Sequence, residues 1–131
     1  MFTNKNKKFI ARKDLDVLAD HLRKKKINSI DEKGNAINDF FANAELIEEN
    51  DFPWEVVRLN SKVIIRDKIA RLNYTYTVVM PEQADHKQCK VSIFSVIGSA
   101  LFGNRRGDDI YWKTPKGKRY FTIMAVSQYA Y

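Results

Sequence analysis

Few side chains in this sequence are placed to do chemistry, and the most suggestive are two neighbouring acids, Asp31 and Glu32. They lie in the loop expected between two predicted helices, which is the tip of a helical hairpin. Carboxylates at such a tip could hold a metal ion in the active site of another protein. The alternative is local, because acids here also cap the following helix. Capping is the favoured interpretation, so we expect no metal and no cofactor in this chain.

The sequence offers little else for catalysis. Its one cysteine, Cys89, follows His86 just before a predicted strand, but no third group is placed to orient a base, so we expect a partly buried, unreactive thiol. His21 lies at the edge of an apolar helical stripe and should flank the core. Asp108 and Asp109 should point to opposite faces of a strand, with Asp108 accepting backbone N–H bonds in a turn. We therefore expect that the protein is not an enzyme.

Basic and aromatic residues alternate through the C-terminal part of the chain. Such a mixture could follow a phosphate backbone and stack bases, although aromatic residues on strands equally well form a core or cover a sheet. No RNP, KH or zinc-finger signature supports sequence-specific recognition. The residues are Arg58, Lys62, Arg66, Lys68, Arg71, Arg105, Arg106, Lys113, Lys116, Lys118 and Arg119, with Tyr74, Tyr76, Tyr111, Trp112 and Tyr120.

The formal net charge of +7 is unevenly distributed. Residues 1–54 carry 10 basic and 10 acidic side chains, whereas residues 55–131 carry 13 basic and 6 acidic ones. The whole excess therefore lies in the C-terminal part. A basic surface raises the rate of encounter with nucleic acid or with an acidic protein face. The alternative is a surface charge that only keeps the protein soluble.

Helical periodicity in the first 54 residues predicts two helices. The first stripe consists of Leu15, Leu18, Ala19 and Leu22. Asp14 is placed to cap its start. The second stripe consists of Ile37, Phe40, Phe41, Ala44 and Ile47. Its helix begins at Ser29, in a capping box with Glu32, or at Asn35, and it ends before Pro53. A short connection predicts an antiparallel two-helix hairpin, a coiled-coil-like arm.

After Pro53 the periodicity changes to two residues, which predicts strands. The candidates are Lys62–Arg66, Leu72–Met80, Lys90–Phe94, Asp109–Lys113 and Arg119–Ser127. Between the third and the fourth lies IGSALFGN, in which Ile97, Ala100 and Leu101 share one helical face and Gly103 can supply a left-handed C-terminal cap. The pattern predicts an α+β fold with an antiparallel sheet wrapped around one short helix. The expected domains are the arm, 1–54, and this module, 55–131.

The composition is that of a globular protein, with 131 residues, 44% hydrophobic and 30% charged. No apolar run approaches the roughly 18–20 residues that a membrane span needs, and no signal peptide is recognisable. A single cysteine excludes an internal disulfide. We therefore expect a cytoplasmic protein without membrane contact.

Three segments, LNSKVIIRD, YTVVMPEQAD and VSIFSVIGSALFGNRRGDDIYWKTPKGKRYFTIMAV, follow one another over residues 59–128. In order and spacing they resemble the C-terminal domain of the GreA/GreB transcription elongation factors. The residues that carry the resemblance are Ser95, Ile97, Gly98, Ala100, Leu101, Gly103, Gly107 and Asp108. The resemblance implies an FKBP-like fold for residues 55–131.

The same resemblance implies docking on the rim of the RNA polymerase secondary channel, through the loop before the short helix. In this chain that loop is Phe94, Ser95, Val96 and Ile97. Phe94 stands where the cleavage factors often have an acid, and Val96 where they have proline. The short hairpin is similar to that of Rnk, the regulator of nucleoside diphosphate kinase, a Gre-related protein with a truncated coiled coil.

The sequence therefore predicts a non-catalytic regulator that binds RNA polymerase. Helices of about 13 residues give an arm only ~20 Å long, so we do not expect stimulation of transcript cleavage. One alternative is direct binding of DNA or RNA by the basic C-terminal module. A further alternative, suggested by the FKBP-like topology alone, is a peptidyl-prolyl isomerase with Tyr111 and Trp112 lining a pocket.

Overall fold

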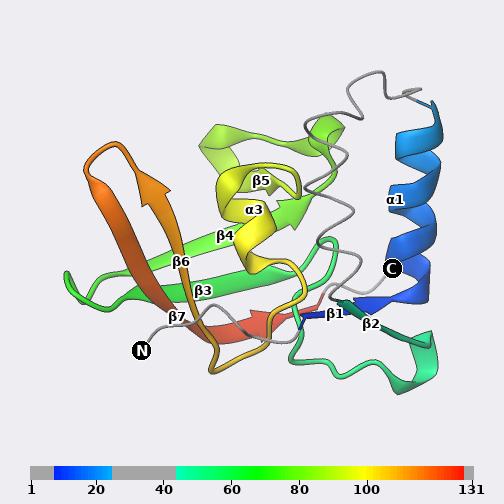
Figure 1. Ribbon diagram of the computed structural model, residues 1–131, viewed down its shortest axis with the longest axis horizontal. Helices are drawn as coiled ribbons and strands as arrows, with labels where there is room; N and C mark the ends of the chain where they lie inside the picture. The colour runs from blue at the N-terminus through cyan, green and yellow to red at the C-terminus, as the bar shows by residue number, and fades with distance from the viewer. Residues whose placement is uncertain (1–7, 25–43, 129–131) are drawn as a thin grey trace.

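The structure is a computed structural model that describes residues 8–24 and 44–128. Figure 1 places α1 at one end of the molecule and the β3–β4 and β6–β7 hairpins at the other. The helices and strands are β1 (Lys8–Ala11), α1 (Arg12–Lys24), β2 (Ala44–Ile47), β3 (Lys62–Asp67), β4 (Asn73–Val79), β5 (Lys90–Ser92), α3 (Val96–Leu101), β6 (Asp109–Thr114) and β7 (Gly117–Ser127). Short 3-10 turns, η2 (Glu49–Asp51), η3 (Pro81–Gln83) and η4 (His86–Gln88), complete the described elements. In this part of the chain no helix is long and apolar enough to cross a membrane.

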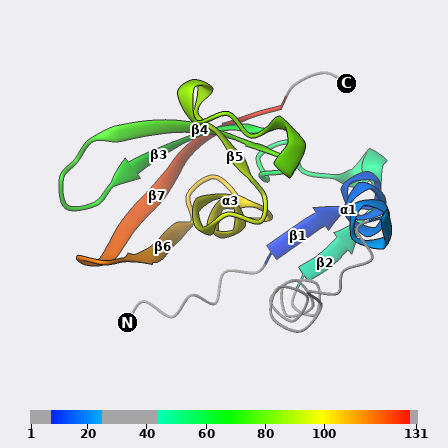
Figure 2. The ribbon, with the colours of Figure 1, turned by 90° about the horizontal axis from the view of Figure 1, so that it is seen from above.

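The C-terminal part forms a five-stranded sheet in the order β5-β4-β3-β7-β6, which curls around α3 (Figure 2). The five strands and the one helix predicted from residue 62 onward are confirmed, with ends that differ by up to two residues. The expectation of a purely antiparallel sheet is wrong, because β5 pairs with β4 in parallel. The two 3-10 turns after β4 carry the chain back before β5 begins. Residue spacing predicts strands but not their direction.

The core lies between α3 and the inner face of this sheet. Alternate residues of β3 and β7, such as Val63, Ile65, Phe121 and Ile123, are almost completely buried there. Trp112 of β6 joins them, with its ring stacked on that of Phe121 at a centroid distance of 4.3 Å. The alternation of the strands therefore determines which aromatic residues form the core.

The prediction of the second N-terminal helix is wrong over the residues that the structure describes. Ala44–Ile47 forms β2, which pairs in parallel with β1 over its whole length. β1 is in turn held against the C-terminal part, because the Phe9 amide donates to the Gly103 carbonyl at 2.9 Å. A strand partner far away in the sequence thus overrides the local helical spacing. Residues 25–43, which include the other members of the stripe, lie outside the described residues.

The first predicted helix is confirmed as α1, and Leu18 of its stripe is buried. The role assigned to Asp14 is wrong, because the helix begins at Arg12 and Asp14 lies within its first turn, only 1% exposed. Ile10 and Leu18 belong to the same hydrophobic cluster as Val57. Residues on both sides of the predicted boundary at 54/55 therefore share one core, and the division itself stays a prediction.

An ion-pair network centred on the buried pair of Arg58 and Asp14 joins α1 to the segment that leads into β3. The Arg58 guanidinium donates to both carboxylate oxygens of Asp14, at 3.3 and 3.2 Å, and to both of Glu49, at 2.7 and 3.0 Å. The Leu59 amide also donates to Asp14, at 3.1 Å. Burial raises the pKa of Asp14, while the hydrogen bonds and charge of Arg58 oppose that rise. The same arginine lowers the pKa of Glu49 through its hydrogen bonds.

We expect Arg58→Met to destabilise the protein by about 3–5 kcal/mol, because it leaves the Asp14 carboxylate buried without a partner charge. Thermal or urea unfolding of the purified chain measures the loss. Adding Asp14→Asn should recover part of it, since the buried charge is then gone. The matched control is Arg12→Met, which removes an exposed ion pair with Glu48 and should cost no more than about 1 kcal/mol. Equal losses in Arg58→Met and Arg12→Met would contradict the role of the buried network.

Candidate docking surface

Hydrogen bonds of two serines hold the loop of residues 94–97, the candidate docking loop, in shape. The Ser95 hydroxyl donates to the Ser92 carbonyl at 2.6 Å and accepts from the Gly98 amide at 3.0 Å, which caps the start of α3. The Ser92 hydroxyl accepts from the Phe94 amide at 3.0 Å. Ser95 therefore serves the local structure of the loop, and any contact with a partner would be made by its neighbours.

Gly98 is required where α3 crosses the end of β5. A Cβ atom at this position would lie 1.9 Å from the Ser92 carbonyl oxygen, far inside any real contact distance. Only glycine lets the helix approach the backbone this closely. The loop between Ser92 and Gly98 is thus fixed at both ends by the same close contact.

The apolar residues of this loop differ in exposure. Val96 is 60% exposed, while Phe94 and Ile97 are partly buried and pack against the hydrophobic core. The arrangement exposes one branched apolar side chain on a short, capped turn, while the other two apolar side chains of the loop pack against the core. An exposed apolar side chain of this kind suits an apolar contact with another protein. None of these apolar side chains could act in catalysis.

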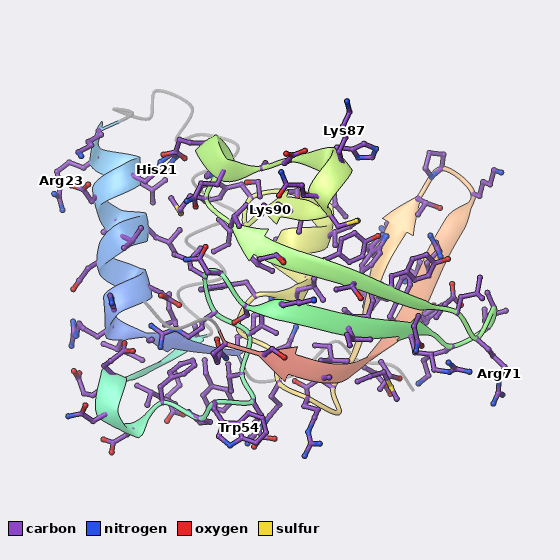
Figure 3. The ribbon with its side chains drawn as sticks, turned by 180° about the vertical axis from the view of Figure 1, so that it is seen from behind. His21, Arg23, Trp54, Arg71, Lys87 and Lys90 are labelled. Atoms are coloured by element: carbon purple, nitrogen blue, oxygen red, sulfur yellow. The ribbon has the colours of Figure 1, made fainter. Side chains whose placement is uncertain are left out.

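The sequence analysis missed the contact between this loop and α1. The His21 ring stacks on the Phe94 ring with centroids 5.5 Å apart, and its Nδ1 lies 3.8 Å from the Glu82 carboxylate. Figure 3 shows His21 on the side of α1 that faces the sheet. His21 thus flanks the core as expected, but its partner is a residue of the candidate docking loop. Local spacing held no signal for this contact, which links elements far apart in the chain.

Lys8 of β1 is a second positioning residue that the sequence analysis missed. Its Nζ donates to the Ser99 carbonyl at 2.7 Å and to the Phe102 carbonyl at 3.2 Å. These carbonyls lie in and just after α3, where the helix has unpaired acceptors and a negative dipole end. Burial lowers the pKa of Lys8 to about 8. β1 therefore fixes the end of α3, while Ser95 fixes its start.

The other candidate residues are separate from this surface. Asp108 accepts from the Arg105 amide at 2.9 Å, which confirms it as a turn residue, and Asp109 forms an ion pair with Lys68. The expectation of a partly buried Cys89 is wrong, because the thiol is exposed at the end of η4.

The two candidate tip residues, Asp31 and Glu32, lie outside the described residues. Among the described residues no cluster of three or more His, Cys, Asp or Glu side chains is arranged to hold a metal ion.

Comparison with known proteins bears on this surface. The family model for "Transcription elongation factor, GreA/GreB, C-term" matches residues 52–128, a range that contains the whole candidate docking loop. Transcription elongation factor GreA from Amoebophilus asiaticus is 35% identical over 91 residues, which are 70% of this chain and 58% of that protein. GreA from Orientia tsutsugamushi is 32% identical over 123 residues, 94% of this chain and 70% of its own length.

The solved structure of a GreA/GreB elongation factor from Nitrosomonas europaea is similar in both sequence and fold. It is 30% identical to this chain with a TM-score of 0.77, and the match covers 92% of this chain and 99% of that one. The similarity therefore includes the N-terminal part as well as the sheet.

We expect Gly98→Ala to destabilise the protein by about 1–3 kcal/mol or more, because the new methyl group forces α3 away from the Ser92 carbonyl. The matched control is Ser99→Ala, one residue further along the same helix, where the side chain is exposed and the change should cost less than about 1 kcal/mol. Thermal unfolding measures both effects. A Gly98→Ala variant as stable as Ser99→Ala would show that the close contact does not constrain the loop.

Proposed function

The chain belongs to the GreA/GreB family of transcription elongation factors, and we propose that it binds RNA polymerase at the rim of the secondary channel through residues 94–97. The observation that carries the proposal is the capped loop itself, in which Ser95 and Gly98 hold Val96 outward. The family match supports it, because the matched range includes this loop. The related proteins are named for transcription elongation, which points to the polymerase as the partner.

We also propose that the chain regulates transcription without stimulating transcript cleavage. α1 has 13 residues and is therefore about 20 Å long. A hairpin arm no longer than α1, as the sequence predicts, would occupy the channel entrance rather than deliver Asp31 and Glu32 to a distant active centre. An FKBP-like topology of the C-terminal module and a short Rnk-like arm are part of the same proposal, as is a place in the cytoplasm, where bacterial transcription occurs.

The contact of α1 with the loop gives this proposal a structural basis. Because His21 stacks on Phe94, α1 lies directly against the proposed docking loop. The buried Arg58 network fixes the root of the same helix. A partner that binds the loop would therefore receive the arm in a defined direction.

No observation favours the isomerase alternative. Tyr111 and Trp112 are adjacent on β6, so their side chains point to opposite faces of the sheet. Trp112 is buried in the core, and the two rings do not line one pocket.

We expect Val96→Glu to weaken binding to cognate core RNA polymerase by about tenfold or more, because it places a charge in the centre of an apolar contact. Fluorescence titration of the labelled protein at moderate salt measures the affinity. The matched control is Ile69→Glu, which makes the same kind of change at the tip of the β3–β4 hairpin, at a site 78% exposed. It should bind as the unaltered chain does. Absence of micromolar binding by the unaltered chain would refute the proposal.

We expect the purified protein to leave the rate of transcript cleavage in a stalled, backtracked polymerase complex unchanged, since its arm is short. Gel analysis of end-labelled RNA, with a full-length GreA relative as the positive control, measures that rate. Faster cleavage that disappears in an Asp31→Asn, Glu32→Gln variant would contradict the proposal and assign the tip acids a direct role.

A further inference from the structure

The face of the sheet opposite to α3 carries a concentration of positive charge. Strand alternation and register place a set of long side chains on this outer face, which lies on the convex side of the curl (Figure 2). We call this set the basic tyrosine face; it consists of Lys62, Arg66, Tyr111, Lys113, Lys118 and Tyr120.

Two lysines of this face repel each other electrostatically. Lys113 of β6 and Lys118 of β7 are direct cross-strand partners, so two like charges stand opposite each other. Like charges that lie directly opposite each other destabilise a sheet. Neither lysine forms an ion pair with an acid of the described chain, whereas the nearby Lys68 does so with Asp109 at 2.9 Å. The hairpin therefore holds an excess of positive charge that an anionic ligand would relieve.

Two aromatic rings lie beside this charge. Tyr111 and Tyr120 are cross-strand partners with ring centroids 5.9 Å apart, and both are partly exposed. The Lys118 ammonium lies 4.9 Å from the centre of the Tyr111 ring. Partly exposed rings next to cations are the elements of a platform that stacks bases and binds the phosphates between them.

We propose that the basic tyrosine face binds single-stranded nucleic acid, with phosphates at Lys113 and Lys118 and unpaired bases against Tyr111 and Tyr120. Stacking on these rings requires unpaired bases, so a duplex fits less well. An acidic protein would explain the lysines but makes no use of the tyrosine pair. The face lies on the other side of the sheet from α3 and the docking loop. This inference therefore goes beyond the polymerase contact and does not depend on it.

The experiment measures fluorescence anisotropy of a labelled 12-nucleotide oligouridine, and of the matching oligo-dT, with the full chain and without polymerase. The first variant is Lys113→Gln, Lys118→Gln. Its matched control is Lys24→Gln, Lys87→Gln, which removes the same charge from α1 and from η4; Figure 3 shows Lys87 at the edge of the molecule. Both pairs are exposed, so neither should disturb the fold.

Binding of the unaltered chain should weaken steeply with salt. The Lys113→Gln, Lys118→Gln variant should bind more weakly, and the slope of log affinity against log salt should fall by about 1.4, two phosphates at ~0.7 each. The control pair should change the slope by much less. Equal effects of the two pairs, or no effect of either, would overturn the proposal by showing that only overall charge matters.

A second pair of variants tests stacking. Tyr120→Leu should weaken binding by about tenfold, whereas Tyr120→Phe keeps a ring and should retain most of the affinity. Circular dichroism melting confirms that each variant folds, and if Tyr120→Leu does not, the lysine pair still decides. Equal affinity for a duplex of the same length would overturn the proposal. So would a polyglutamate peptide that competes fully while Tyr120→Leu binds normally, an outcome that assigns the face to an acidic protein. Binding of RNA, DNA or both supports the proposal. The ratio of the two affinities shows which kind of strand the face prefers.

Discussion

The structure depends first on the burial of one cation between two carboxylates. Arg58 is only 7% exposed and pairs with Asp14 of α1 and with Glu49 of η2. Buried charges are costly without partners, so Arg58 and Asp14 hold each other in place, and the exposed Glu49 adds a second carboxylate to the same guanidinium. Since the network lies where the chain passes from its N-terminal part into the sheet, it fixes the direction in which α1 leaves the molecule. The aliphatic core alone would bind the helix but would specify that direction less sharply.

A second constraint is the close approach of α3 to β5. Gly98 has no room for a side chain beside the Ser92 carbonyl, while Ser95 caps the helix start and Lys8 binds its end. A helix of six residues has little intrinsic stability, so these contacts from outside position it. They bear on the proposed docking only indirectly, because the same contacts define the loop that exposes Val96.

The two surfaces of this elongation-factor homologue differ in character. The proposed docking loop is apolar and small, and it contacts α1 through the His21–Phe94 stack. The basic tyrosine face is charged and aromatic and lies on the opposite side of the sheet. The basic side chains of this face, Lys62, Arg66, Lys113 and Lys118, are therefore separated from the proposed docking loop. If both proposals hold, the C-terminal module binds a protein on one side of the sheet and an anionic polymer on the other.

The sequence by itself determined the strands from residue 62 onward, α3, α1 and the loop before α3, because their signals are local periodicity, capping residues and glycines. It also identified the basic and aromatic residues, although not which of them share a face. Tertiary structure alone decided that Ala44–Ile47 is a strand, that β5 runs parallel to β4 and that Asp14 is a buried partner of Arg58 rather than a cap. It likewise decided that His21 meets Phe94. Each of these depends on residues far apart in the chain, and no local pattern encodes the partner that supplies the stabilising contact.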